Sequence, residues 1–274
     1  MKKIASVALA TLATLATFAA CSSDDGGDGK GTVTFTTWGE DFIEREIPPK
    51  DESGEVIVED GKEPAARLAT PKLFDMHAPG PKPVTVFSDL PGKAYTHVSY
   101  AVSPATATLE LGGGATDADK QLMVQNGYSL YVEGSVVKEG ATKSFTWGFK
   151  TSTLYDRCKG EVSGKETEGV VVTNGGNDAI ELTIHGDHLF YDDLQAPEAK
   201  VRVDNIANAD ADADGKITLE ELAAVDLADK TKITAGTYGT GSASNINDLR
   251  AFVEALSRTV GHFRGEGECL ARAK

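Results

Sequence analysis

The fold is decided by two stretches, YSLYVEGSVV at residues 128–137 and SFTWGF at residues 144–149. Apolar and polar residues alternate in both, which places Phe145, Trp147 and Phe149 together on one face. A period of two is typical of a strand with one buried face. The connection between the stretches contains a glycine, which tolerates the positive φ of a tight turn. The sequence therefore predicts a β-hairpin.

The same alternation extends over most of residues 32–195. A second hairpin is predicted to join 169–173 to 179–184 through an Asn-Gly-Gly-Asn turn. One helix interrupts the pattern, beginning after the capping residue Thr116 and ending at Gly127. Short strands with frequent turns favour an antiparallel β-sandwich-like body.

A sequence of different character, DADADGKITLEE, occupies residues 210–221. Ca²⁺ takes about six to eight oxygen ligands, and alternate acidic residues can point inward where the chain curls around the ion. Gly215 permits the sharp turn, and Glu221 stands where EF-hand loops place a bidentate carboxylate. The predicted ligands are the side chains of Asp210, Asp212, Asp214, Thr218 and Glu221 and the main-chain carbonyl of Lys216. The alternative is an acidic surface turn.

From residue 196 onward the apolar period shifts toward 3.6. A helix is predicted over Pro197–Ala209, and Leu222 and Val225 continue an apolar stripe after the loop. We therefore expect a helical EF-hand unit over 196–230, in which calcium acts mainly as a structural clamp. No second loop of this kind occurs in the chain, so the loop either packs on the sheet or pairs between molecules. The fold class predicted from these patterns is α+β, a β-sandwich-like body followed by a C-terminal helical EF-hand region.

The N-terminus has the pattern of an export signal. Lys2 and Lys3 precede an uncharged apolar run, which ends in Phe-Ala-Ala-Cys at residues 18–21. This ending resembles the lipobox of bacterial lipoproteins, which implies a signal peptide over 1–20 and acylation of Cys21. An ordinary secretory signal is the alternative. Residues 21–31 contain almost no apolar side chains and form a predicted flexible tether.

Export moves a protein into an oxidising compartment. Once Cys21 is acylated, Cys158 and Cys269 are the remaining cysteines, so we expect them to form a disulfide. Two free buried thiols are the alternative. The bridge would staple the tail of the C-terminal segment 231–274 to the sheet. That segment also contains a predicted helix, capped by Asn245 and carrying an apolar face.

The chain is acidic. Asp and Glu number 42 against 27 Lys and Arg, which gives a formal net charge of −15 at pH 7. Coulomb repulsion at this charge disfavours nucleic acid and anionic lipid surfaces as partners. The expected partners are a membrane, through the lipid anchor, and an unidentified protein or ligand for the β-rich body.

A second group of candidate metal ligands lies near residue 185. His185, Asp187 and His188 occur close together in the sequence, and His262 follows the last predicted helix and could approach them. Imidazole and carboxylate ligands suit zinc or copper. The alternative is that these side chains only form hydrogen bonds at a strand-to-helix junction. A transition-metal binding protein or metal-dependent enzyme is therefore the second functional hypothesis.

As a whole, the chain resembles EF-hand-containing lipoproteins of Gram-negative bacteria. The resemblance rests on the cysteine that ends the signal, on the 210–221 loop, and on the phrases Thr-Trp-Gly and Gly-Asp-His-Leu-Phe-Tyr-Asp-Asp. It implies a lipid-anchored protein of the cell envelope, at the outer membrane. We find no nucleophile with a partnered base, so the sequence predicts a non-catalytic calcium-binding protein.

Overall fold

The computed structural model describes residues 29–40, 49–60, 63–162 and 165–274. The predicted signal peptide 1–20, Cys21 and most of the tether 21–31 lie outside these ranges. Within the described ranges, no helix is both long and apolar enough to cross a membrane.

The predicted hairpin is present as β9 (Leu130–Lys138) and β10 (Ala141–Phe149). Ala141 pairs with Lys138, so the turn consists of Glu139 and Gly140 alone, both with positive φ. Phe145, Trp147 and Phe149 are buried, as the alternation predicts. Because the turn and both strands are adjacent in sequence, local patterning was enough to predict this element.

The hairpin belongs to the larger of two main sheets. Most of its pairs are antiparallel, but β16 joins β10 in parallel. The strand order is β16 (Lys216–Ile217), β10, β9, β2 (Pro49–Asp60), β7 (His97–Val102), β11 (Thr153–Asp156) and β18 (Leu270–Ala273). Three shorter strands extend it. β3 (Glu63–Arg67) and β4 (Lys72–Asp75) pair with β2, and β8 (Glu110–Leu111) pairs with β4.

The second main sheet contains β17 (Gly261–Phe263), β15 (Asn177–His185), β1 (Lys30–Glu40) and β5 (Lys82–Pro91), in that order. Here β1 and β15 are parallel, with Thr32 opposite Asn177. The predicted second hairpin is therefore wrong. Its first arm, β14 (Val170–Val171), pairs with β6 (Ala94–Tyr95), and its second arm is β15. A separate pair is formed by β12 (Lys159–Val162) and β13 (Lys165–Glu168).

The first helix, α1 (Asp117–Asn126), forms as predicted. Thr116 and Asp119 make a capping box, in which each side chain accepts a hydrogen bond from the other residue's backbone N–H. Gly127 ends the helix in the left-handed conformation.

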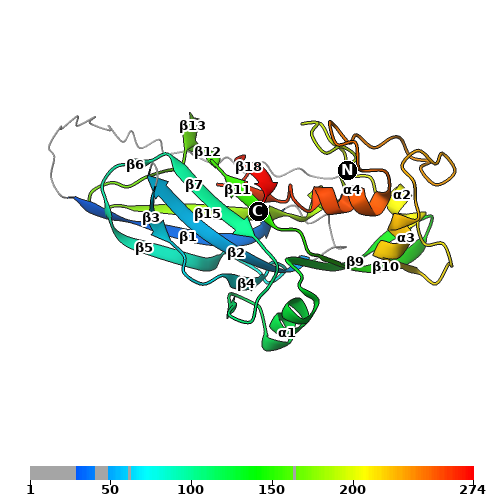
Figure 1. Ribbon diagram of the computed structural model, residues 1–274, viewed down its shortest axis with the longest axis horizontal. Coiled ribbons are helices and arrows are strands. Elements are labelled where there is room, and N and C mark those ends of the chain that lie inside the picture. Colours follow the sequence, from blue (N-terminus) through cyan, green and yellow to red (C-terminus); the bar gives the residue numbers. More distant parts are fainter. Residues whose placement is uncertain (1–28, 41–48, 61–62, 163–164) are drawn as a thin grey trace, which may run out of the picture.

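The prediction of a C-terminal helical EF-hand region is wrong. After residue 196 the structure has three short helices, α2 (Asp204–Ala207), α3 (Leu219–Ala223) and α4 (Leu249–Leu256), gathered beside β9 and β10 (Figure 1). The described chain is mostly β, in several sheets that include parallel pairs, so an α+β fold with a purely antiparallel sandwich is also incorrect.

Backbone hydrogen bonds to other segments explain why the helices are short. The Lys200 N–H donates to the Asp192 side chain and the Arg202 N–H donates to the Phe190 carbonyl, so neither group is available for a helical hydrogen bond. At the other end, Asp248 rather than Asn245 caps α4. The periodicity was present, but pairing between distant segments overrode it.

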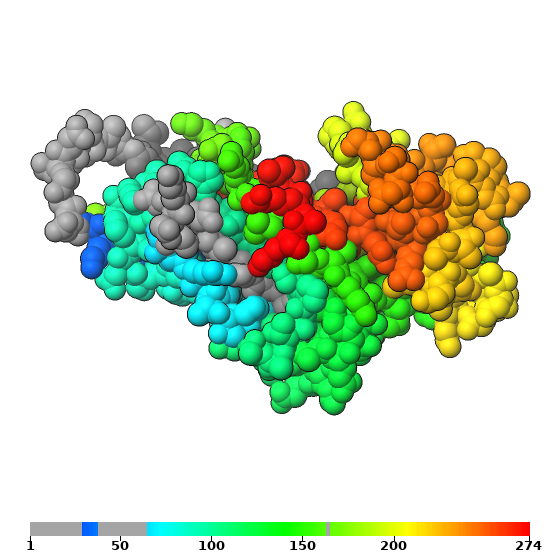
Figure 2. Space-filling model, in the orientation of Figure 1, coloured from blue at the N-terminus to red at the C-terminus, as the bar shows by residue number. Residues whose placement is uncertain are grey.

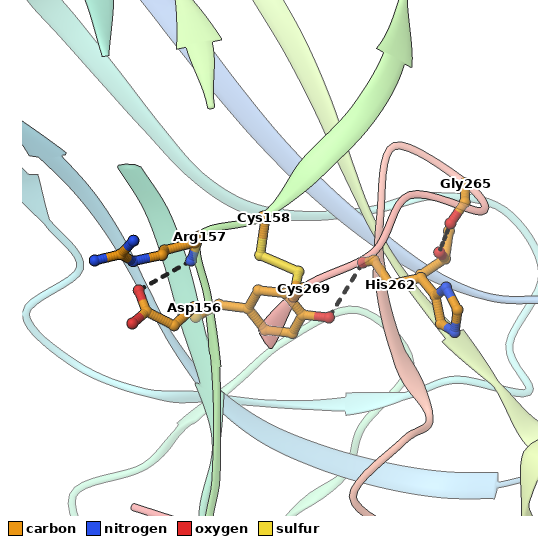
Figure 3. Close-up of a disulfide and its surroundings, with 8 residues drawn as sticks. Asp156, Arg157, Cys158, His262, Gly265 and Cys269 are labelled. Atoms are coloured by element: carbon orange, nitrogen blue, oxygen red, sulfur yellow. Dashed lines mark hydrogen bonds between the residues drawn. A yellow bond between two sulfur atoms is a disulfide. The ribbon is translucent and has the colours of Figure 1, made fainter. Parts of the chain in front are cut away.

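The C-terminal segment is attached to the large sheet by a disulfide and by its last strand. Cys158 and Cys269 meet as predicted, with their sulfur atoms bonded at 2.05 Å (Figure 3). Directly after Cys269, β18 pairs with β11 along the large sheet. Figure 2 shows this C-terminal segment, in red, on the surface between the strand-rich end and the helical end.

Candidate functional site

The loop at residues 210–221 is a tight turn held by its own side chains. Asp212 Oδ1 accepts a hydrogen bond from the Asp214 N–H at 3.1 Å, and Asp214 Oδ1 accepts one from the Lys216 N–H at 2.7 Å. Gly215 has a φ of 81°, which a side chain would disfavour. These bonds curl the backbone where the sequence predicts an ion.

Three predicted calcium ligands meet inside this curl. Asp210, Asp212 and Glu221 each offer one carboxylate oxygen, and these oxygens lie within 4.8 Å of one another. Charges of one sign at this separation repel each other, and a cation between them removes that repulsion. Hard oxygen donors of this kind suit Ca²⁺.

Asp210 is the most enclosed of the three. Its side chain is 1% exposed, and one oxygen, Oδ2, lies 3.1 Å from Lys143 Nζ. The other oxygen, Oδ1, is buried and has no hydrogen-bond partner in the described chain. Burial raises the pKa of this carboxyl. The hydrogen bond and charge of Lys143, together with the backbone N–H groups of Gly215 and Ala213, outweigh that effect, so the pKa lies below its ordinary value. Asp210 is therefore ionised at neutral pH with an acceptor left to fill.

Glu221 is held in place through both of its oxygens. Oε1 accepts from the Ala211 N–H at 2.9 Å, and Oε2 accepts from the N–H and hydroxyl of Thr218 at 2.9 and 3.0 Å. Burial raises the pKa of the Glu221 carboxyl, but the hydrogen bonds from Thr218 and Ala211 lower it by more, so the pKa lies below its ordinary value. The carboxylate is thus charged and oriented toward the curl.

The large sheet supports the loop from behind. Within the loop, Lys216 and Ile217 form β16 and pair with Ser144 and Phe145 of β10. The indole N–H of Trp147 donates to the Ile217 carbonyl at 2.8 Å. Of the two arrangements that the sequence leaves open for a lone loop, packing on its own sheet is the one observed.

The remaining predicted ligands lie outside the group of three. The Asp214 side chain is 46% exposed and lies 3.9 Å from Lys216 Nζ. The Thr218 hydroxyl is engaged in capping α3, where it accepts from the Glu221 N–H at 3.1 Å. As calcium ligands, Asp214, Thr218 and the Lys216 carbonyl remain predictions.

The histidine group lies in the second main sheet. His185 ends β15, His188 follows in the 3-10 turn η1 (Gly186–Phe190), and His262 is the central residue of β17. Thr183 of β15 is directly opposite His262, so His185, two residues later, shares the face of His262. One ring nitrogen from each histidine lies within 4.8 Å of the other two.

Burial disfavours the charged forms of His188 and His262. His185 and His262 are 2% and 6% exposed, and His188 is half-buried. Burial, with the neighbouring charges of His262 and His185, lowers the pKa of His188 to about 3. Burial and His185 also lower the pKa of His262, against the opposing effect of Glu268 and Glu266. Neutral imidazole is the form that binds metal ions.

A cavity of about 520 Å³ opens beside the histidines. Its lining includes His188, His262, Tyr155, Tyr191, Glu266 and Glu268. The disulfide borders it through Cys269, and Figure 3 shows His262 on the segment next to that bridge. The Tyr100 hydroxyl donates to the His262 carbonyl at 3.1 Å, which fixes the backbone there.

Asp187 does not join the three histidines as a grouped ligand. The strand ends at His185, so Asp187 lies in the turn η1, and its Oδ2 accepts from the Tyr191 hydroxyl at 2.7 Å. His185 and Asp187 would share a strand face only if β15 continued through Asp187, and it does not.

Sequence reasoning missed several partners of these groups. They are Lys143 beside Asp210, and Thr183 and Thr259, whose hydroxyls contact His185 and His188. Lys143 and Thr259 are distant in sequence from the groups they contact, and Thr183 belongs to no known metal-binding motif, so no local motif indicates any of the three. The pairing of β10 with β16 is what brings Lys143 to the loop.

Comparison of the chain with family models, curated proteins and solved structures gives no match. The resemblance to EF-hand-containing lipoproteins thus remains a sequence-level expectation.

Proposed function

We propose that this protein binds one Ca²⁺ in the loop at residues 210–221, and that the ion clamps the loop to the sheet. Two observations carry the proposal: one carboxylate oxygen each from Asp210, Asp212 and Glu221 lie within 4.8 Å of one another, and the buried Oδ1 of Asp210 lacks a hydrogen-bond partner in the described chain. An acidic surface turn needs no such enclosed acceptor, because its carboxylates remain hydrated.

The surroundings support a structural role for the ion. The loop lacks the two long helices of an EF-hand, and its support comes from β10, the Trp147 indole and the Thr218 cap. Calcium would join Asp210, at the end of the α2 segment, to Glu221 in α3, while β16 between them stays on the sheet. At about 100 times its dissociation constant, a bound ion adds roughly 2.7 kcal/mol to the free energy of unfolding.

Lys143 shapes how the ion binds. Its ammonium group neutralises part of the Asp210 charge when calcium is absent, so the loop can remain folded. Calcium must compete with that interaction. We therefore expect Lys143→Met to raise calcium affinity while it destabilises the calcium-free protein.

Calcium titration of the purified full-length protein tests the proposal. Terbium can replace calcium in such a titration. Its emission reports on the loop because the Trp147 indole, which is hydrogen-bonded to the Ile217 carbonyl, lies close enough to transfer excitation energy to the ion. We expect one ion per chain, with a dissociation constant of roughly 10⁻⁴ to 10⁻³ M or tighter, the range of extracellular calcium modules. A chelator should lower the melting temperature, and Mg²⁺ should substitute poorly because it prefers a smaller octahedral shell.

A pair of neighbouring substitutions supplies the control. Glu221→Gln removes the central charge yet preserves capping, because glutamine also serves at that capping position. Glu220→Gln removes the same charge one residue away, from a side chain that is 81% exposed. Only the first should weaken binding strongly. Equal losses of calcium affinity in the two variants, or a melting curve that a chelator leaves unchanged, would show that the loop is an acidic surface turn without a calcium site.

We further propose that the protein is held at the cell envelope by acylated Cys21, with the acidic body projecting on its tether. The support is the sequence pattern of residues 1–21. Acyl chains anchor through about 0.8 kcal/mol per buried methylene. In this setting the β-rich body is non-catalytic and faces an unidentified partner.

A further inference from the structure

We propose that His185, His188 and His262 form a site for one divalent transition-metal ion, zinc or copper, with an open coordination position toward the adjoining cavity. This site is separate from the calcium loop. The carrying observation is the convergence of one nitrogen from each ring within 4.8 Å, together with the buried Nδ1 of His262, which has no hydrogen-bond partner in the described chain.

The hydrogen bonds around His188 determine which nitrogen carries its proton. The Thr259 hydroxyl has a single proton and donates it to the Leu256 carbonyl at 2.9 Å. Its oxygen must therefore accept from His188 Nδ1, 3.1 Å away. The lone pair of His188 then resides on Nε2. An outer hydroxyl or carbonyl that orients a histidine in this way is characteristic of metal sites.

The same reasoning applies to His185. Thr183 donates its one hydroxyl proton to the Gly265 carbonyl at 2.8 Å, so its oxygen accepts from His185 Nε2 at 3.3 Å. The lone pair of His185 is thereby assigned to Nδ1. Two of the three rings thus have tautomers set by threonines that already use their protons elsewhere.

The third ring supplies the unfilled nitrogen. His262 is 94% buried, and a buried polar atom without a partner costs about 1–3 kcal/mol. A metal ion bonded to His262 Nδ1 would remove that cost.

Ligand chemistry and access define the kind of ion. Three imidazoles suit zinc and copper and disfavour calcium or magnesium, which prefer oxygen. Tetrahedral zinc holds its nitrogens roughly 3.3 Å apart at bond lengths of about 2.0–2.1 Å, so small ring movements would suffice. Closed structural zinc sites have four protein ligands. Three histidines next to a cavity of about 520 Å³ instead leave a position for water or a small anion.

Calorimetric titration of the untagged full-length protein with Zn²⁺ and with Cu²⁺, after chelator treatment, tests this inference directly. A polyhistidine tag must be avoided because it binds both ions. We expect one ion per chain at micromolar or tighter affinity, undiminished by millimolar calcium. The copper form should show nitrogen hyperfine coupling in its electron paramagnetic resonance spectrum. Absence of stoichiometric binding by the folded wild-type protein would overturn the proposal without reference to any variant.

Variants locate the site. His262→Ala and His188→Ala should weaken zinc binding by more than the roughly 10- to 100-fold typical for loss of an outer partner, and Thr259→Val should fall within that range. His77→Ala is the matched control, because His77 is exposed and only its backbone N–H contacts Asp75. Glu221→Gln should leave zinc binding intact. Unchanged zinc affinity in both His188→Ala and His262→Ala would place the ion elsewhere and refute the site.

The open position has its own readout. Co²⁺ replaces Zn²⁺ in nitrogen sites and reports its coordination in visible absorption. We expect bands of a four- or five-coordinate ion in the wild-type protein, and a shift on adding azide, which would occupy the position facing the cavity. A cobalt spectrum that azide leaves unchanged would contradict the open position, since a closed four-ligand site has no vacancy for the anion.

Discussion

Removal of the disulfide should be the most informative change to global stability. The bridge joins residues 111 positions apart, and in the chain-entropy model a loop of that length contributes about 4.8 kcal/mol at 25 °C. The double substitution Cys158→Ala and Cys269→Ala removes this restraint from the unfolded chain. It also removes a fully buried sulfur at Cys158, so the loss should slightly exceed the entropic value.

Urea unfolding measures the effect. With a slope of about 3 kcal/mol per molar urea, the midpoint should fall by roughly 1.6 M. Reduction of the wild-type protein supplies the control, because it breaks the bridge while leaving both sulfur atoms in place. The C-terminal segment should also loosen locally, since every side chain of β18 is exposed and its described attachments are its backbone pairing with β11 and the Arg272–Asp156 ion pair. A midpoint shift below about 0.3 M in both the reduced and the substituted protein would refute the reasoning.

The remaining predictions concern anchoring, backbone geometry and acid. Cys21→Ala should release the protein from membranes or leave it unprocessed, and metabolic labelling with a fatty-acid analogue should lose its signal; a wild-type protein that takes up no label would disprove acylation. Gly169→Ala should lower the free energy of unfolding by about 2 kcal/mol or more, because its Cβ would lie 1.9 Å from the Tyr95 carbonyl oxygen. Gly175 has a similar positive φ but faces open space, so Gly175→Ala should lower it by less in the same urea assay. Burial lowers the pKa of His188 from 6.5 to about 3, so below pH 6.5 the unfolded chain binds a proton that the folded chain does not. The metal-free protein should therefore lose stability as the pH falls below 6.5. The variant His188→Gln should show a smaller loss of stability between pH 6.5 and 5.

Local chemistry explains which parts of the fold were predictable. The β9–β10 hairpin and α1 each contain their own turn or cap within a few residues, so alternation, Gly140 and the Thr116 box were sufficient. The Asn-Gly-Gly-Asn turn was misleading. It does reverse the chain, but β15 finds a better partner in β1, some 145 residues earlier, and no local signal reveals that pairing.

The two candidate sites show the same limit. The loop was recognisable because its ligands are contiguous in sequence, and the gathering of Asp210, Asp212 and Glu221 follows from that spacing. The approach of His262 to His185 was anticipated only as a possibility, since it depends on β17 pairing with β15. Thr259 follows α4 and lies 71 residues from His188 in the chain, so no local motif indicates their contact.

The parallel pairing of β1 with β15 has a consequence for the order in which the molecule is assembled. A polypeptide emerges from a ribosome or a translocation channel N-terminus first, so β1 can meet β5 early but must wait for residues 177–185 before its other edge is covered. Long-range closure of this kind is slow, and it leaves a strand edge open to other chains in the meantime. Both candidate ion sites need residues from the last third of the chain, with His262 among the latest. A chain stalled before β17 would therefore have neither the group of three histidines nor a completed second sheet.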